Sequence, residues 1–416
     1  MRRDWAILLG AYLFLVIATT GFLQPFLALY LQAAGLGYSQ VGWALGIGYG
    51  SLLLVQPIIG RISDLIDQRR PFIFLSALAA GIAYMSFPRA NGLAEFAGLL
   101  VVGFNGAAYL GAIGGGVGGV LVARLVGPEK GGAAYASLRV WGSIGYIVIA
   151  LLSGLLVHPS DHSRAGLDPV FQICPLLFFA AALLSVFLPD PRSRQPERVL
   201  AERAPLPPNL VRFLVAYFLY NMALYGASNF ISLYLKQLNT SPEWIPRIFA
   251  VGVVCEVMVM RRSGKWSDIY GRRPLLMLAF LALPIRLILY APAPNAYWVA
   301  AVQSLHGLNF GIMGAVSVAF AMDLATDHSH GHAQARLGAV TGLAMAIGPA
   351  CFGWISQQMG LREMFCVASG VGALAATLLI VLVEDSHPSP QPLFERAPGW
   401  IRPCLRLLDR PLGRKA

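Results

Sequence analysis

The sequence predicts an all-α membrane protein with twelve transmembrane helices arranged as two pseudo-symmetric six-helix bundles. The prediction depends on the composition, on the apolar segments and on a loop pattern that occurs in both halves. Of the 416 residues, 57% are hydrophobic and only 12% are charged, whereas soluble proteins carry roughly 25% charged residues. This deficit indicates that most of the surface faces lipid.

Twelve apolar segments are long enough to cross a bilayer, which takes about 20 mainly apolar residues in a helix. They lie at 5–32, 40–62, 71–88, 93–123, 133–157, 170–189, 210–235, 244–263, 274–291, 296–325, 335–359 and 363–384. The first segment is too long for the apolar core of a signal peptide and has no clear cleavage site, so we expect a membrane span there.

The basic residues are distributed unequally between the two sides of the membrane that these spans define. The net charge is +11, but the basic residues form short clusters between apolar segments, which argues against nucleic-acid binding. One side receives only Arg89, Arg164, Lys236 and Arg362. Because cytoplasmic loops carry the excess of Lys and Arg, we expect both termini in the cytoplasm and a multi-pass location in the cell inner membrane.

The middle of the chain has a composition unlike that of either half. It is polar, basic and rich in proline, which is typical of a linker. We therefore expect an N-terminal bundle (1–189), a cytoplasmic linker (190–208), a C-terminal bundle (209–384) and a basic cytoplasmic tail (385–416).

A related loop follows the second and the eighth predicted span. Its residues are Gly60, Asp64, Arg69 and Arg70 in the first copy, and Gly264, Asp268, Gly271, Arg272 and Arg273 in the second. Glycine permits close helix contact, and an aspartate can bind a neighbouring helix N-terminus. We expect these loops to latch the two bundles in one conformation; the alternative is a charge cluster that only sets the topology.

These loops resemble the G-x-x-x-D-[RK]-x-G-[RK]-[RK] motif of the major facilitator superfamily. The second copy departs from the motif at Ile269, and the first departs at Leu65 and Asp67. The resemblance covers the chain to about residue 384. It implies the major facilitator fold, with a central cavity between two bundles and alternating access.

Among the ionisable residues within predicted spans, four stand out: Arg139, Glu256, Arg286 and His306. A charge at the bilayer centre costs roughly 2.5–3.5 kcal/mol on insertion scales, so each is a candidate for function. Arg139 is expected to line the cavity and to bind a carboxylate or sugar hydroxyls. The alternative is a side chain that extends to the cytoplasmic interface.

The other three form a candidate proton-coupling group. Glu256 lies in an otherwise apolar stretch and is a candidate proton carrier, the alternative being a static ion pair with Arg286. An imidazole titrates near neutrality, so His306 suits a proton relay or a solute hydrogen bond, with Asn309 on the same helix face. The alternative for His306 is a packing role.

These residues also resemble the group that contains the lactose permease, the phenylpropionate permease and the nucleoside–proton symporters. Residues 138–145 are similar to the span-5 motif of that group, and 303–311 to a segment of the phenylpropionate permease. The resemblance implies that Arg139 and Tyr146 bind the solute and that the span-8 acid, the span-9 arginine and the span-10 histidine couple protons.

Two positions depart from the sugar permease. Asn309 and Leu121 stand where that protein has acids. Glu256 and His306 must therefore carry any coupled protons, and Arg139, without an acidic partner, is suited to an anionic solute.

Several weaker signals have structural explanations. Asn105 and Asn221 are further candidates for solute binding, and Gln24, Tyr109, Tyr225 and Asn229 are similar, although each suits an interhelical hydrogen bond equally well. Gly42, Gly46 and Gly50 form a small-residue stripe for helix packing. His328, His330 and His332 suit a solvated loop better than a metal site, and the five cysteines include no CxxC pair. We expect no metal and no cofactor.

These patterns predict a secondary active transporter, proton-coupled, that takes up a small polar or anionic metabolite such as an aromatic acid, nucleoside or saccharide. The alternatives are a drug or metabolite exporter of the same superfamily, or a non-transport membrane assembly protein on this fold. Nothing indicates an enzyme, because no nucleophile–base pair is found. The expected partners are a small-molecule substrate, protons and the lipid bilayer, but no nucleic acid, and we expect a monomer.

Overall fold

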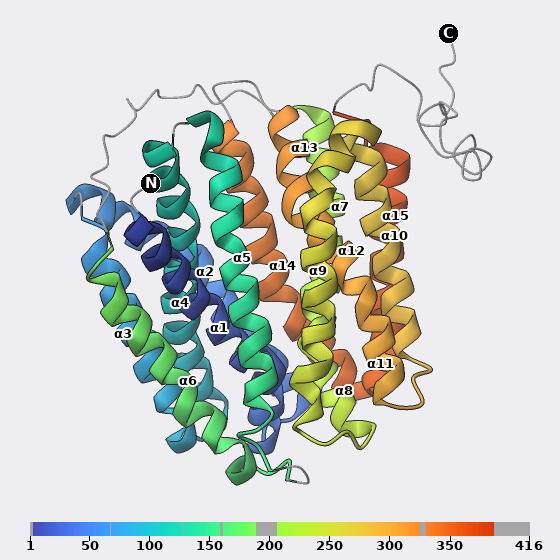
Figure 1. Cartoon of the computed structure of the whole chain (residues 1–416). Coiled ribbons are helices and arrows are strands. Elements are labelled where there is room, and N and C mark those ends of the chain that lie inside the picture. The colour runs from blue at the N-terminus through green and yellow to red at the C-terminus, as the bar shows by residue number, and fades with distance from the viewer. Residues whose placement is uncertain are drawn as a thin grey trace.

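The computed structural model describes residues 3–66, 68–126, 128–158, 161–188, 206–324 and 330–386, without the side chains of 3–6, 64, 112–139 and 330–332. Within these ranges the regular structure is helical throughout (Figure 1). The first half contributes α1 (Arg3–Ala33), α2 (Tyr38–Ile66), α3 (Arg70–Met85), the 3-10 turn η1 (Phe87–Arg89), α4 (Gly92–Val126), α5 (Pro128–Ser153) and α6 (Arg164–Ser185).

The second half has several interrupted spans. It contributes α7 (Pro208–Ser228), α8 (Ile231–Gln237), α9 (Trp244–Tyr270), α10 (Arg272–Tyr290), α11 (Ala296–Val302), the 3-10 turn η2 (Gln303–Leu305), α12 (His306–Ile312), the π-helical turn η3 (Met313–Ser317), α13 (Val318–Asp323), α14 (His330–Met359) and α15 (Leu361–Leu382). Since α7 and α8 form one pass and α11 to α13 another, the described helices make the twelve passes that the sequence predicts.

Ten of these passes contain a described helix that is long and apolar enough to cross a membrane. The other two are α5, whose described apolar part is limited to Val140–Ser153, and α9, whose apolar run is interrupted by charges such as Arg247 and Glu256. The sixth pass begins at Arg164 rather than at residue 170, because Ser163 caps the helix by accepting a hydrogen bond from the Gly166 amide.

The helices pack as two groups. In the first half α1 packs on α5 and α6, and α3 packs on α4 and α6; in the second half α15 packs on α7 and α10, and α9 packs on α12. The two groups meet mainly where α2 packs on α14 and α5 packs on α9. The expected linker and tail lie almost wholly outside the described residues, so their limits remain predictions.

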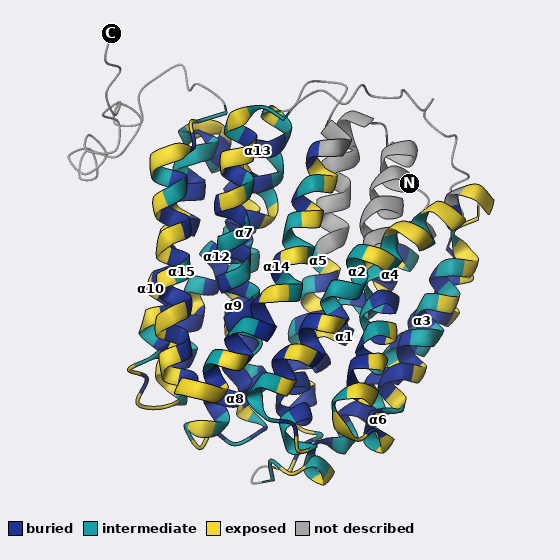
Figure 2. Ribbon diagram, turned by 180° about the vertical axis from the view of Figure 1, so that it is seen from behind, coloured by how far each residue is buried: buried dark blue, intermediate teal, exposed yellow. Residues whose placement is uncertain are grey.

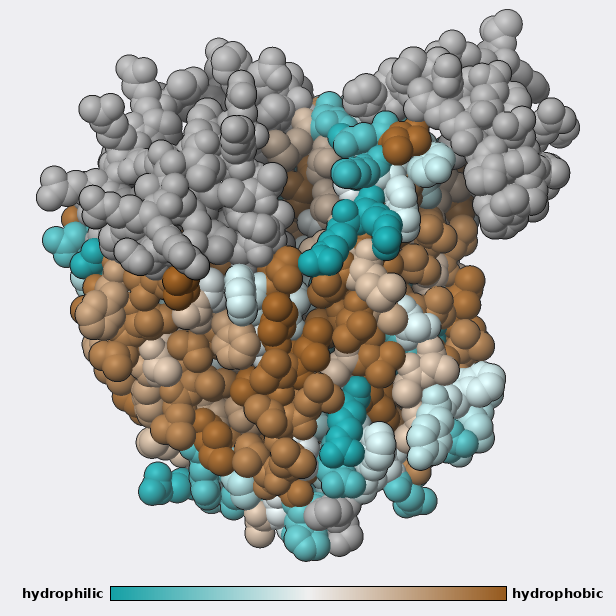
Figure 3. All heavy atoms as spheres, viewed as in Figure 1, coloured by the Kyte–Doolittle hydropathy of each residue, from teal (hydrophilic) through white to brown (hydrophobic). Residues whose placement is uncertain are grey.

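The outer surface is apolar, as expected for a protein in lipid. Buried residues lie mainly where helices face one another (Figure 2), while large apolar side chains such as Leu54, Leu155 and Leu183 point outward. Figure 3 shows this hydrophobic surface across the middle of the molecule, with hydrophilic residues gathered towards its two ends. The bilayer is therefore the solvent for most of this surface.

Candidate functional site

The candidate site in the second half is built on close contact between α9 and α12. A Cβ atom on Gly307 would lie 2.6 Å from the carbonyl oxygen of Cys255, and one on Gly311 would lie 3.0 Å from the carbonyl oxygen of Glu256. The two glycines are one helical turn apart and share a face. They allow the two backbones to touch, as small residues do between membrane helices.

This contact brings Glu256 and His306 together. Nε2 of His306 lies 3.3 Å from Oε2 of Glu256, and the ring stacks on Phe310 with centroids 4.2 Å apart. The glutamate side chain is 22% exposed and the histidine side chain 9%. Nδ1 of His306 is buried and has no hydrogen-bond partner among the residues that the structure describes. A neutral ring can therefore carry its proton on Nε2, towards the carboxylate, and leave Nδ1 as an acceptor.

Arg286 lies behind this pair and is almost completely buried, with 1% of its surface exposed. Its guanidinium donates to the Tyr290 hydroxyl at 2.9 Å, to Oε1 of Gln303 at 2.7 Å and to Oδ1 of Asn309 at 3.4 Å. All three acceptors are neutral, and in the described part of the chain no carboxylate forms an ion pair with Arg286. The alternative of a static Glu256–Arg286 ion pair is therefore not what the structure shows.

Asn309 belongs to the Arg286 network. It is fully buried, and its amide nitrogen donates to the carbonyl oxygen of Ala279 at 3.1 Å while its amide oxygen faces Arg286. The Tyr220 hydroxyl donates to its backbone carbonyl. In this conformation Asn309 therefore orients the guanidinium, and its expected role in solute binding remains a prediction.

The α9–α12 contact leads to a stability prediction. Gly307→Ala should destabilise the purified protein by about 1–3 kcal/mol, the range for overpacking a close contact, because the new methyl group would meet backbone atoms of Cys255. The control is Gly314→Ala in the same pass, where the nearest atom would be 3.8 Å away. Thermal unfolding in detergent measures both, and equal unfolding temperatures would contradict the proposed contact.

Residues of the first half approach the site from across the interface. The Tyr146 hydroxyl on α5 donates to Oε1 of Gln24 on α1 at 2.8 Å. Tyr146 and Ala150 also form a buried apolar cluster with Ala250 and Val253 of α9. This cluster lies one to two turns from Glu256 towards the start of α9.

Of the other expected solute ligands, Asn105 and Asn221 form hydrogen bonds away from this pair. The Arg139 side chain lies outside the described residues. Asn105 bonds within the first half, donating to the Ser51 hydroxyl at 2.7 Å and accepting from Gln56. Asn221 donates to the carbonyl oxygen of Tyr217, one turn back in its own helix. The roles of these three residues in solute binding remain predictions.

The second latch loop is tied within its own half. Arg272 donates to the Ser267 hydroxyl and to Asp268, both on α9, and lies 3.2 Å from Oδ2 of Asp323 on α13. Gly271 has a φ of +93°, which favours glycine. The Arg273 side chain donates to the carbonyl oxygen of Ile380 on α15. The loop thus joins α9, α10, α13 and α15.

The first latch loop is less completely described. Arg69 precedes α3 and Arg70 is its first residue, while the Asp64 side chain lies outside the described residues. Among the described residues, no atom outside the local helix would lie within 4 Å of a Cβ on Gly60 or on Gly264. The described residues therefore show no close helix contact at either glycine, and the expected latch between the bundles remains a prediction.

The opposite end of the molecule is held closed between the two halves. A Cβ on Gly42 of α2 would lie 2.2 Å from the carbonyl oxygen of Pro349 and 3.0 Å from Cα of Gly353, both on α14, and Gly46 is similarly close to Ala346. The glycine stripe predicted for helix packing is thus confirmed at these two positions, with α14 as its partner.

Polar bonds cross the same end. Lys236 donates to Oε1 of Gln32 at 3.0 Å, and Nε2 of His162 lies 2.9 Å from the carbonyl oxygen of Thr240. Since a carbonyl oxygen only accepts, Nε2 carries the proton. Partial burial lowers the pKa of His162, which favours the neutral ring.

Comparison with known proteins assigns the family. Residues 6–367, most of the chain, match the MFS_1 like family. The chain belongs to this family of the major facilitator superfamily. It is a multi-pass membrane transporter and not an enzyme.

Relatives of this MFS transporter cover nearly its whole length. An uncharacterised MFS-type transporter of Mycobacterium tuberculosis strain H37Rv is 27% identical over 397 residues, with 87% of this chain and 88% of the relative covered. The maltose permease of Geobacillus stearothermophilus is 25% identical over 383 residues, covering 88% and 93%. The multidrug resistance protein MdtG of Salmonella paratyphi B is 25% identical over 376 residues, covering 86% and 90%.

Solved structures agree with the fold. A crystal structure of a variant of the nucleoside transporter NupG has a TM-score of 0.77 at 14% identity and covers 91% of this chain and 100% of that one. The D-xylose–proton symporter has a TM-score of 0.70 at 16% identity, with 92% and 97% covered. At these identities the likeness shows the fold alone, and it confirms the predicted major facilitator architecture.

Sequence reasoning missed two members of the Arg286 network. Gln303 and Tyr290 supply two of the three acceptors for the buried guanidinium. Their spacing could have indicated both residues. Gln303 is one turn before His306 and shares its helix face, and Tyr290 is one turn after Arg286 and shares that residue's face.

Proposed function

We propose that this MFS transporter couples the uptake of a small polar or anionic metabolite to proton movement by alternating access. The observation that carries the proposal is the contact between Glu256 and His306, a titratable pair that is still partly exposed. Groups of this kind within membrane spans commonly form proton relays. The second half supplies the proton site, and both halves supply solute contacts.

The charges around the pair support an anionic solute. With Glu256 ionised, His306 neutral and Arg286 positive, the three side chains sum to zero. One added proton leaves a net positive charge in a weakly screened environment, where electrostatic interactions are strong. An anionic solute in the adjacent cavity would compensate this charge, so proton and solute would bind more favourably together than separately, which is the condition for symport.

Tyr146 is proposed as a solute ligand of the first half. Its hydroxyl is positioned by Gln24, and its α5 helix packs on α9, the helix that carries Glu256. Arg139 is two turns before Tyr146 on α5 and is proposed to bind the anionic group. The likeness to a maltose permease supports a saccharide as an alternative to an aromatic acid or a nucleoside.

The proposed orientation places both termini in the cytoplasm of a cell whose inner membrane holds the chain as a monomer. It is supported by the charge asymmetry, since Arg89, Arg164, Lys236 and Arg362 all lie at the end opposite the start of α1. In this orientation the closed end seen here is the external one, and the titratable pair is accessible from the cytoplasm.

Uptake into proteoliposomes tests the proposal. Across a panel of aromatic acids, nucleosides and saccharides, we expect at least one solute to accumulate when the outside is made acidic, and not when the two sides have equal pH. Liposomes without protein are the control. Accumulation of a solute that ignores the pH gradient would remove the proton coupling and leave the transporter assignment intact.

Export of drugs or metabolites is the second candidate function. The likeness to MdtG over 86% of the chain favours it. The same vesicles distinguish the two: an exporter in inside-out orientation would accumulate lipophilic cations or drugs and leave the metabolite panel untouched.

A further inference from the structure

A histidine in the loop between α5 and α6 joins the two halves at the closed end. Nε2 of His162 donates to the carbonyl oxygen of Thr240, in the loop before α9, at 2.9 Å. The histidine is half-buried in this contact. The two halves also approach closely beside it, because a Cβ on Gly154 would lie 2.5 Å from the carbonyl oxygen of Glu243. When this end opens, His162 must leave Thr240 and its ring must return to water.

Two charged side chains among the described residues act on His162 electrostatically, one from each half. Asp161 precedes it in the same loop, and Lys236 faces it from the end of α8. Asp161 stays beside His162 in every conformation, because the two residues are neighbours in the chain. Lys236 is beside His162 only while the two halves are in contact. Closure therefore adds a positive charge to the surroundings of the imidazole.

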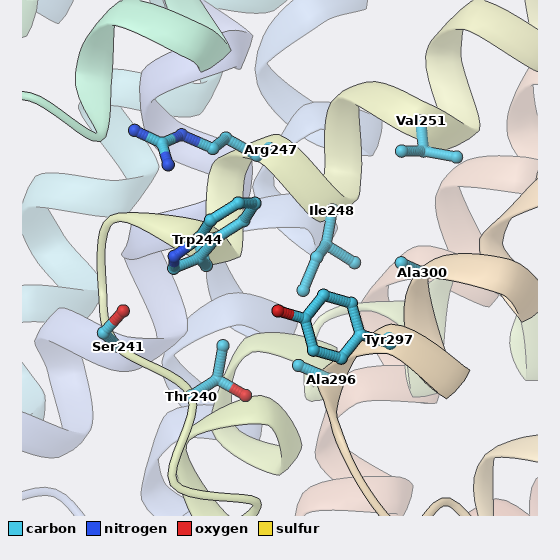
Figure 4. Close-up of a pocket in the computed structure, with 9 residues that line it drawn as sticks. All are labelled: Thr240, Ser241, Trp244, Arg247, Ile248, Val251, Ala296, Tyr297 and Ala300. Atoms are coloured by element: carbon cyan, nitrogen blue, oxygen red, sulfur yellow. The ribbon is translucent and has the colours of Figure 1, made fainter.

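Other charges near this contact are held elsewhere. The Arg247 guanidinium lies 4.6 Å from the centre of the Trp244 ring, on the far side of that ring from Thr240 (Figure 4). The Arg164 guanidinium donates to the carbonyl oxygen of Ala90 at 2.7 Å, within the first half. The charge that closure brings to His162 is therefore that of Lys236.

Lys236 is itself paired with a neutral group. Its Nζ atom donates to Oε1 of Gln32 on α1 at 3.0 Å, and in the described part of the chain no carboxylate forms an ion pair with it. A charged His162 would thus face a second positive charge across a partly buried contact, where screening is weak. Partial burial and, less strongly, Lys236 lower the pKa of His162, against the opposing effects of the Thr240 carbonyl and Asp161.

We propose that His162 is a pH sensor that opens the closed end when the solution on that side becomes acidic. The hydrogen bond to Thr240 is not the switch, because a neutral and a charged imidazole can both donate from Nε2. The switch is the added charge, which is unfavourable beside Lys236 and away from water. Separation of the two halves removes both penalties.

The sign of the response follows from linkage. The lowered pKa belongs to the closed conformation, so the closed conformation binds the proton more weakly than the open one. Protonation must then favour the open conformation to the same extent. The shift begins as the pH falls through the ordinary histidine pKa of about 6.5 and is complete below the lowered pKa of the closed conformation. In the proposed orientation this end is external, so external acid favours the conformation that admits solute from outside.

Distances between spin labels test this response in the purified full-length protein, in nanodiscs and without solute. Labels on Gln40 of α2 and Gln358 of α14, both exposed, span the closed end. The measurements are made at about pH 7.5 and about pH 5.5, on either side of the ordinary histidine pKa. At the lower pH the population with a long label distance should increase about fivefold or more, the lower end of the usual coupling between two sites.

Three variants assign the response to a residue. In His162→Gln the amide can still donate to the Thr240 carbonyl but cannot titrate, so the label distances should no longer change with pH. Lys236→Gln removes the facing charge and should reduce the response without abolishing it, because the partial burial remains. The matched control is His158→Gln, an exposed histidine of the same loop, which should leave the response unchanged.

Several outcomes overturn the inference. They are a pH response in His162→Gln equal to that of the unmodified protein, a closed end that tightens in acid, and an equal loss of response in His158→Gln. A response that persists in His162→Gln and disappears in Glu256→Gln would assign the pH dependence to the Glu256–His306 pair. The measurements need neither solute nor a pH gradient, so the sensor and the proposed uptake function succeed or fail separately.

Discussion

Glu256→Gln is expected to abolish accumulation driven by a pH gradient, with initial uptake reduced more than about tenfold. Glutamine has the shape of glutamate but cannot titrate in this range. It can still accept a hydrogen bond from Nε2 of His306, which lies 3.3 Å from the carboxylate. The site should therefore stay folded while losing its proton carrier.

Exchange of labelled for unlabelled solute separates coupling from folding. Exchange at equal pH needs no net proton transfer, so the Glu256→Gln protein should retain it once the solute has been identified. Uptake and exchange lost together would indicate a damaged binding site, and gradient-driven uptake that survives would show that Glu256 carries no coupled proton.

The matched control is Glu243→Gln. Glu243 immediately precedes the same helix, α9, but lies at its end rather than in the apolar stretch. Its substitution should leave gradient-driven uptake within about twofold of the unmodified protein. A comparable loss in both variants would point to an effect of α9 rather than of the titratable pair.

Gly42→Val is expected to reduce transport more than about tenfold by preventing the closed end from closing. A Cβ at this position would lie 2.2 Å from the carbonyl oxygen of Pro349, and a backbone atom cannot move aside as the tip of a side chain can. Overpacking of about 1–3 kcal/mol shifts a two-state equilibrium by roughly 5- to 150-fold. The population should move to the conformation that is open at this end.

Spin labels on α2 and on α14, one on each side of their contact, measure this shift. Gln40 and Gln358 are exposed near the contact between α2 and α14, and the distance between labels on them should increase in Gly42→Val. Gly338→Val on α14 is the control, because no atom of a packing neighbour in the described part of the chain lies within 4 Å of its Cβ position. An unchanged label distance in Gly42→Val would mean that the contact between α2 and α14 tolerates the valine and does not control the conformation.

The helical passes were predictable because the bilayer imposes a length and an apolar composition on each of them. The irregular turns within a pass could not be predicted in this way. Nothing in the apolar pattern indicated that the tenth pass is divided by a 3-10 turn at Gln303 and a π-helical turn beginning at Met313. Such turns arise where side chains and neighbouring helices compete with the regular hydrogen-bond ladder.

The candidate site was only partly predictable for a related reason. Sequence analysis selected Glu256, Arg286 and His306 because charges in hydrocarbon need an explanation. It left open whether the glutamate pairs with the arginine. The structure pairs it with His306, because the glycine contacts at Gly307 and Gly311 set how far α12 approaches α9 and which faces meet. Arg286 instead donates hydrogen bonds to the neutral side chains of Tyr290 and Gln303.

By itself the sequence determined that this chain crosses a membrane twelve times, which residues carry charge into the hydrocarbon, and its likeness to the major facilitator superfamily. These properties depend on composition, spacing and local motifs. Only the tertiary structure decided that Asn309 holds Arg286, that the second loop joins helices of one half, and that α2 closes against α14. Each depends on the rotation and depth of helices far apart in the chain, which packing over the whole bundle sets.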